Sequence, residues 1–166
     1  KGTIFRRNSI RGVSDQVMGL PVGGDHCGIG LEQSAGTLVE GNVIRDVLLL
    51  GIDYYLDVGS IVRRNHISGT PKGIYPHSSG GEVYGNHIDL PAGAGAAINA
   101  VSTGGTLSVH DNTIYGAGAL AILADATSGP VSIWQNAVYS SSANCRLVIP
   151  TGPVDIGVNP LLLITP

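Results

Sequence analysis

Hydrophobic and polar residues alternate over short segments in the stretch Gly73–Asp89, and glycine or asparagine separates the segments. In its first segment, Ile74 and Pro76 fall on one face, while Tyr75 and His77 fall on the other. Two further short segments follow the Gly-Gly pair and the Asn of the same stretch. Successive side chains of a strand point to opposite faces, so the pattern predicts three short strands joined by two corners.

The same arrangement recurs along the whole chain and is marked by an Asn followed two residues later by an aliphatic residue. The copies are Asn8/Ile10, Asn42/Ile44, Asn65/Ile67, Asn86/Ile88, Asn112/Ile114, Asn136/Val138 and, in a weaker form, Asn159/Leu161. Their spacings are 34, 23, 21, 26, 24 and 23 residues. A glycine corner and a β-branched strand precede most copies, as in Gly59–Val62 and Gly105–Val109. An earlier strand opens each repeat with a small residue followed by Ile, at Ile29, Ile52, Ile74, Ile98 and Ile122.

A period of this length with alternation inside each segment favours an all-β solenoid. Helical-pair solenoids have longer repeats and a period of 3.6, and the fixed leucine frame of leucine-rich repeats is missing. The pattern predicts a single-stranded parallel β-helix of about six to seven rungs, stacked at the ordinary strand separation of about 4.8 Å. One inward Asn per rung, at one corner, predicts an internal ladder of hydrogen-bonded amides.

Composition agrees with a buried core and tight corners. Apolar residues make up 43% of the chain and charged residues 13%, and there are 25 glycines in 166 residues. The formal net charge of -3 comes without a basic run, so we expect no nucleic-acid partner. The longest apolar runs are far too short to span a membrane, so we expect no membrane span.

We expect residues 1–166 to form one β-helix domain that is a piece of a longer protein. The segment from Gly12 to Cys27 is the longest departure from the repeat and predicts a loop. Neither end carries an evident capping helix, although a solenoid needs its ends covered. We therefore expect missing segments or oligomerisation to cover the ends.

The Gly-Ile strand, the glycine corner and the asparagine ladder together resemble the right-handed parallel β-helix (pectin lyase-like) superfamily of pectate lyases, polygalacturonases and alginate epimerases. The resemblance covers nearly the whole chain and implies a right-handed helix. In that family the ladder lies between the second and third strands, which makes the Gly-Ile strand the first. It implies that the outer face of the first strands is the substrate groove, that a polysaccharide is the ligand, and that the protein is secreted or at the cell surface.

Stacking the first strands with their Ile residues inward places two columns of side chains on this outer face. One column is Gly30, Asp53, Tyr75, Asn99 and Leu123, and the other is Glu32, Tyr55, His77, Val101 and Asp125. Neighbours lie about 4.8 Å apart within a column and about 6.6 Å apart within a strand. The polar members therefore form one patch with two carboxylates, two phenols and an imidazole.

The segment Gly73–His77 is similar to the G-F-D-P-H segment of mannuronan C5-epimerases. Pro76 and His77 match that segment, whereas Tyr75 replaces its Asp and Lys72 replaces a Tyr. The resemblance implies removal of the C5 proton of a uronate, which needs a base and a cation beside the carboxylate.

The residues that we expect to carry such chemistry all lie in or beside this patch. His77 or Tyr75 is the candidate base, and Lys72 is the candidate partner of the substrate carboxylate. Glu32 and Asp53 could instead hold Ca²⁺ for that purpose, as in pectate lyases, or act as the carboxylate pair of a glycoside hydrolase, although they are placed diagonally. No other cofactor is expected.

Further candidates extend the binding surface. Tyr55 and Asn99 lie in the same patch, and a second outward ladder runs Arg6, Glu40, Arg63, Tyr84, His110, Trp134. Its aromatic half, Tyr84, His110 and Trp134, could bind sugar rings or simply stabilise the sheet. His66 and His87 should be stacked neighbours, but Thr113 follows at that position, so we expect no metal site there.

Two classes of function fit this sequence. The first is a carbohydrate-active or carbohydrate-binding module related to uronate lyases or epimerases. The second is a non-catalytic scaffold of the phage-tail, adhesin or surface-repeat type. The ordinary solvated face of a sheet would also carry some of these polar residues, so the patch alone does not separate the two.

Overall fold

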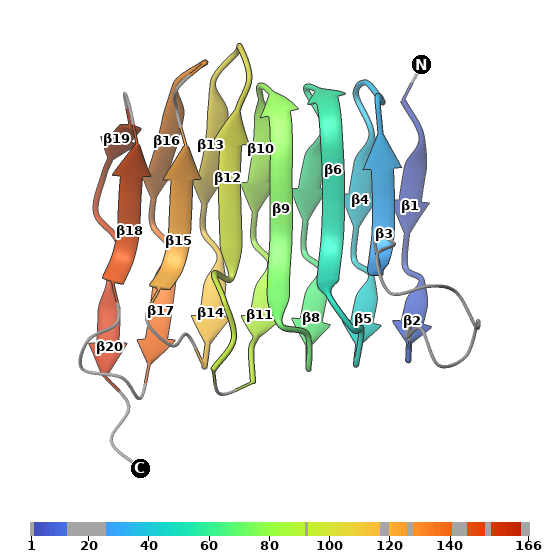
Figure 1. Cartoon of the computed structure of the whole chain (residues 1–166), viewed down its shortest axis with the longest axis horizontal. Helices are drawn as coiled ribbons and strands as arrows, with labels where there is room; N and C mark the ends of the chain where they lie inside the picture. Colours follow the sequence, from blue (N-terminus) through green and yellow to red (C-terminus); the bar gives the residue numbers. More distant parts are fainter. Residues whose placement is uncertain are drawn as a thin grey trace.

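The computed structural model describes residues 2–12, 26–91, 93–116, 120–125, 128–140, 146–151 and 154–163, and every regular element in this part of the chain is a β-strand. The strands form three parallel sheets (Figure 1). The first sheet contains β3 (Cys27–Glu32), β6 (Leu50–Val58), β9 (Lys72–Ser79), β12 (Ile98–Ser102), β15 (Leu120–Asp125) and β18 (Arg146–Thr151).

The other two sheets hold the shorter second and third strands of each repeat. The second sheet contains β1 (Ile4–Arg6), β4 (Leu38–Glu40), β7 (Ile61–Arg63), β10 (Gly81–Tyr84), β13 (Leu107–His110), β16 (Val131–Trp134) and β19 (Val154–Ile156). The third sheet contains β2 (Ser9–Arg11), β5 (Val43–Arg45), β8 (His66–Ser68), β11 (His87–Asp89), β14 (Thr113–Tyr115), β17 (Ala137–Ser140) and β20 (Leu161–Leu163).

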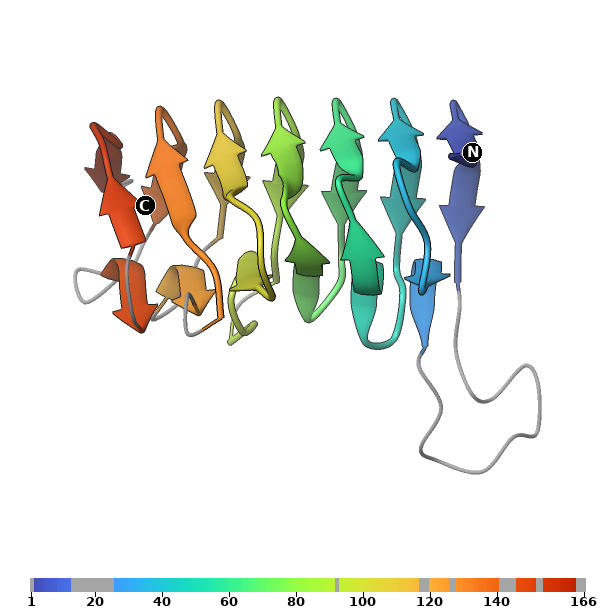
Figure 2. The same cartoon turned by 90° about the horizontal axis from the view of Figure 1, so that it is seen from above.

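Strands that are neighbours in a sheet are three elements apart in the chain, which is the topology of a solenoid. Successive turns lie side by side along the long axis of the molecule, as the view from above shows (Figure 2). The chain makes five turns between β3 and β18, the first and last strands of the first sheet. At one end β1 and β2 extend the other two sheets, and at the other end β19 and β20 do so. The solenoid thus has about five turns between its end strands, slightly fewer than the six to seven rungs expected.

The core is built from the inward residue of each short strand. The five Ile residues of the first strands are at most 4% exposed, as are the Ile or Val residues that follow the ladder asparagines in β5, β8, β11, β14 and β17. In the first sheet Ile29 pairs with Ile52, and Ile52 pairs with Ile74, so like residues stack on like residues. Each turn therefore buries its apolar side chains against the turn before and the turn after it.

The asparagine ladder is confirmed and runs through all seven predicted positions. The side-chain oxygen of Asn86 accepts hydrogen bonds from both the backbone N–H and the side-chain amide of Asn65, at 3.0 and 2.9 Å. The Asn86 amide in turn donates to the side-chain oxygen of Asn112 at 2.9 Å and to the backbone carbonyl of Val62 at 3.0 Å. The same pattern links Asn8 at one end of the ladder with Asn159 at the other.

The backbone conformation turns the chain at the ladder. The residue before each ladder Asn from Asn8 to Asn136 has a positive φ, between 53° and 65°, and only two of these six residues are glycine. Arg7, Arg64 and Gln135 are among the others. A left-handed conformation is unfavourable for such residues, so the stacked amides must hold it in place.

Two further expectations from the sequence concern the Gly12–Cys27 loop and a membrane span. Residues 13–25, which make up most of the predicted Gly12–Cys27 loop, lie outside the described residues. In the described part of the chain, no helix has the length and apolar character needed to cross a membrane.

Candidate functional site

The first sheet presents the two predicted columns on its outer face, and the strand register confirms their order. Gly30 pairs with Asp53, and Asp53 pairs with Tyr75. In the second column Tyr55 lies between Glu32 and His77, because it pairs with both. The polar patch is therefore a real surface of the molecule, and Glu32 and Asp53 are diagonal neighbours as expected.

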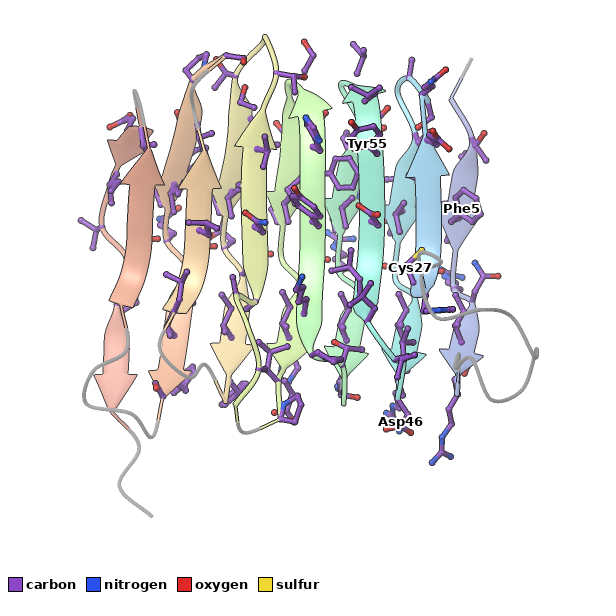
Figure 3. The ribbon with its side chains drawn as sticks, in the orientation of Figure 1. Phe5, Cys27, Asp46 and Tyr55 are labelled. Atoms are coloured by element: carbon purple, nitrogen blue, oxygen red, sulfur yellow. The ribbon has the colours of Figure 1, made fainter. Side chains whose placement is uncertain are left out.

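A pocket of about 480 Å³ lies in this face, over β3 and β6, with one wall from β9. Its lining residues are Cys27, Gly30, Leu31, Glu32, Asp53, Tyr55 and Tyr75. The volume lies in the range of about 300–1,000 Å³ that is typical of small-molecule sites. Figure 3 shows two of the lining residues, with Cys27 at the beginning of β3 and Tyr55 towards the far end of β6.

The hollow exists because Gly30 has no side chain. A Cβ atom at this position would meet only one group, the Cys27 sulfur at 2.9 Å. The position is part of an ordinary extended strand, so nothing in the backbone requires glycine here. A larger residue would fill the space between Asp53 and Cys27.

The chemistry of the pocket is acidic and rich in phenol groups. The carboxylates of Glu32 and Asp53 and the rings of Tyr55 and Tyr75 surround it, and no cationic side chain is among its lining residues. Carboxylates accept hydrogen bonds from hydroxyl groups, and aromatic rings pack on apolar C–H surfaces. The pocket therefore suits a neutral, hydroxyl-rich ligand, whereas a uronate carboxylate would need a cation beside it.

His77 lies at the edge of this pocket, against its aromatic wall. Its ring meets the Tyr55 ring edge-on, with centroids 4.6 Å apart and planes at 81°, and the Tyr75 ring lies 6.4 Å away. The Nδ1 atom of His77 is buried, and no described residue forms a hydrogen bond with it. Histidine bases are usually oriented by such a bond, so any base role of His77 would depend on packing against Tyr55 for orientation.

The structure places the remaining predicted residues of this face at different distances from the pocket. Asn99 lies one turn beyond Tyr75, and its buried side-chain oxygen has no hydrogen-bond partner among the described residues. Lys72 begins β9 and extends past Gly95, with its Cγ 3.6 Å from the Cβ that Gly95 would carry. Lys72 is five positions before His77 along the strand, which places their Cα atoms about 16 Å apart. Lys72 is not among the lining residues of the pocket.

The second sheet carries the predicted ladder that ends in Trp134, and its rings form a stacked column. Tyr84 and His110 are 5.0 Å apart with an angle of 4°, and His110 and Trp134 are 4.5 Å apart with an angle of 6°. Rings stacked in this way cover each other's faces, so a sugar would meet their edges. These three residues form a surface separate from the pocket.

The other half of that ladder is an ion-pair network centred on Glu40. The Glu40 carboxylate is 2.7 Å from Arg6 and 2.8 Å from Arg63, and its side chain is only 13% exposed. Desolvation alone would raise the pKa of Glu40, but the two guanidinium groups outweigh it and hold this pKa below its usual value. This arrangement has a structural role and confirms the predicted Arg-Glu-Arg pairing.

A row of four rings on the third sheet was only half predicted. His66 and His87 are 4.6 Å apart, as expected, but Tyr115 and Tyr139 continue the row at 5.1 and 4.6 Å. Both tyrosines follow the inward aliphatic residue of their repeat by one position, which is the signal that could have found them. No three His, Cys, Asp or Glu side chains of the described residues gather in a way that could hold a metal ion.

Acidification should weaken the third sheet through His66. Burial, followed by the charges of His87 and Arg45, lowers the pKa of His66, whereas Asp89 opposes the shift. A pKa that is lower in the folded state means that the folded protein binds fewer protons, so this contribution to stability is full above about pH 6.5 and is lost as the pH falls below it. Thermal unfolding between pH 7.5 and 5 should show a smaller loss of stability for His66→Gln than for the wild type.

Substitutions of two residues near His66 should change the pH dependence of stability in opposite directions. His87→Gln removes a like charge and should flatten the pH dependence, while Asp89→Asn removes the favourable charge and should steepen it. Identical slopes in all four proteins would contradict this account of His66.

Comparison with known proteins supports the architecture and no more. A family model described as a right-handed β-helix region matches residues 1–156. No curated protein and no solved structure shows a significant match. The similarity of Gly73–His77 to mannuronan epimerases therefore stays a prediction based on those five residues. With a match over nearly its whole length and three parallel sheets of stacked turns, the chain belongs to the right-handed β-helix family.

Proposed function

We propose that this chain is a carbohydrate-binding β-helix module that binds a polysaccharide across the outer face of its first sheet. The observation that carries the proposal is the pocket over Gly30, where two carboxylates and two phenol rings converge. The successive turns, about 4.8 Å apart, repeat at nearly the length of one sugar unit in an extended 1,4-linked chain. One sugar can thus occupy the pocket while its neighbours lie over adjacent turns.

Filling the pocket should abolish this binding. Gly30→Leu places a side chain in the pocket beside Asp53 and Cys27, and we expect at least about a tenfold loss of affinity, or 1.4 kcal/mol. The measurement is the affinity for alginate, polygalacturonate and a neutral 1,4-linked glucan or mannan, each with and without Ca²⁺. Ser108→Leu is a matched control, because Ser108 is an outward residue of β13 on the second sheet. Equal binding by wild type and Gly30→Leu would contradict the proposal.

The same panel identifies the ligand class. Binding of the neutral polymer without Ca²⁺ is the result that the acidic lining favours. Binding of a uronate polymer only with Ca²⁺ would mean that the cation bridges the polymer to Glu32 and Asp53. Glu32 and Asp53 are the only carboxylates in the lining of the pocket, so sugar oxygens or water would complete the six to eight oxygen ligands of Ca²⁺.

A second candidate function is proton abstraction from a uronate by His77, as in a lyase or C5-epimerase. The observation that favours it is the contact of His77 with Tyr55, one of the lining residues of the pocket. In this reaction the imidazole takes the C5 proton, and in a lyase the glycosidic bond to O4 then breaks to leave an unsaturated product. The unsaturated lyase product absorbs in the ultraviolet, whereas epimerisation at C5 is detected by proton NMR. Loss of either product in His77→Ala would establish the site. No new product from any uronate would leave binding alone, and no binding at all would leave the non-catalytic scaffold.

A further inference from the structure

The strand β6 departs from the alternation of the turns that follow it. The turn before β6 departs in the same way, because Gln33, which corresponds to Leu56, is exposed and has a φ of 50°. The residues of β6 alternate correctly up to Tyr55, which is 44% exposed, but the next residue, Leu56, is also exposed by 44% and Asp57 is buried at 1%. The register with β9 shifts between Tyr55 and Asp57, and Leu56 has a φ of 52°. One extra residue has been inserted here as a β-bulge.

The bulge inverts the expected distribution of polar and apolar residues. Without it, alternation would bury Leu56 and expose Asp57. Instead a leucine faces solvent, in a left-handed conformation that is unfavourable for leucine, and a carboxylate enters the interior. Each of these features opposes folding, and such local violations are typical of functional positions.

The turns that follow, with β9 and β12, show what the regular strand looks like. Asp57 pairs with Ser78 of β9, and Ser78 pairs with Ser102 of β12. These two serines donate hydrogen bonds to the carbonyls of Gly80 and Gly105, at 2.6 and 2.8 Å, and close the corner without a bulge. A serine in place of Asp57, and one residue fewer in both β6 and the turn before it, would therefore build the same corner.

Asp57 holds the bulge from inside. Its Oδ1 accepts hydrogen bonds from the Ser34 hydroxyl at 3.0 Å and from the backbone N–H of Val58 at 2.7 Å. Its Oδ2 is buried with no hydrogen-bond partner among the described residues. The carboxylate thus joins the backbone of Val58 to Ser34 of the preceding turn while remaining incompletely satisfied, which is a poor arrangement for stability alone.

We infer that the bulge is a built sugar-binding platform, in which Tyr55 and Leu56 present a continuous apolar surface to the C–H face of one sugar unit and Asp57 positions them. This inference rests on the proposed function and adds a subsite to it. Tyr55 is itself a lining residue of the pocket, so the platform continues the pocket along the strand. Leu56 determines specificity, because a sugar with an axial polar group on its C–H face would lose the apolar contact with Leu56.

The test uses one variant that keeps the bulge and one that removes it. Leu56→Ala keeps the bulge and should bind the polymer that the wild type binds best about three- to tenfold more weakly, with an unchanged melting temperature. Deletion of Leu56 together with Gln33, its counterpart in the preceding turn, combined with Asp57→Ser, restores the regular strand in both turns and keeps their register. It should lose at least tenfold in affinity and melt at a higher temperature than the wild type. Leu48→Ala is the matched control, since Leu48 is also 44% exposed but lies before β6, outside the lining of the pocket.

The two variants and the wild type separate the possible failures. No polymer bound by the wild type would be a failure of the proposed function. Wild-type affinity retained by both variants would overturn the platform. A lower melting temperature or an unfolded chain after removal of the bulge would show that the bulge serves stability, and would also overturn it.

Discussion

Replacing Asn86 by Ala should destabilise the solenoid by about 4 kcal/mol, the largest effect that we expect from a single side chain. Asn86 is 1% exposed and stands in the middle of the ladder. Its removal leaves the amide groups of Asn65 without their acceptor and the carbonyl of Val62 without its donor. Each buried polar group left unsatisfied costs about 1–3 kcal/mol, and the cavity adds to that sum.

Chemical denaturation of Asn86→Ala and of Asn8→Ala measures this effect against a matched control. Asn8 is the exposed first member of the ladder, and among the described residues its side chain only donates to Asn42. We expect Asn8→Ala to cost less than half as much as Asn86→Ala. Equal and small losses in both variants would contradict the account of the ladder as a source of stability.

Replacing Gly51 by Ala should destabilise the protein by about 2 kcal/mol, because the first and third sheets meet closely at this glycine. A Cβ atom here would lie 2.6 Å from the Cγ2 of Ile67 and 2.8 Å from the backbone carbonyl oxygen of Gly73. The carbonyl belongs to the next turn, so the clash cannot be relieved by a side-chain rotation. Either the two turns move apart or Ile67 leaves its position.

The control for Gly51→Ala lies in the same column, two turns further on. Ala97 is fully buried at the corresponding position, which shows that this turn admits a methyl group. Ala97→Gly should therefore cost only about 1 kcal/mol, through lost packing and greater freedom of the unfolded chain. A change of less than about 0.5 kcal/mol in Gly51→Ala, read from thermal and chemical unfolding, would contradict the close contact.

The features of the fold that repeat could be predicted from the sequence, because a solenoid stacks equivalent residues. The spacing of the asparagines predicted the ladder, and alternation from each Ile predicted which residues share the outer face of the first sheet. The register of Gly30 with Asp53, and of Tyr55 with His77, confirms those predictions. The same pattern occurs in every repeat, so a wrong assignment in one repeat does not change the assignment in the others.

The features that depart from the repeat could not be predicted in this way. The pocket depends on the absence of a side chain at Gly30. The sequence pattern places Gly30 in an outward column but does not indicate a pocket there. Alternation alone would place Leu56 inside and Asp57 outside, and the bulge reverses both. The candidate site thus lies where β6 and β3 break the regular pattern.

The most direct test of the proposed function is a crystal structure of the chain soaked with an oligosaccharide of the polymer that it binds best. We expect one sugar unit above Gly30, with its hydroxyl groups on Glu32 and Asp53 and its ring against Tyr55 or Tyr75. Sugar bound instead at Trp134 on the second sheet, or an empty first sheet at saturating oligosaccharide, would contradict it.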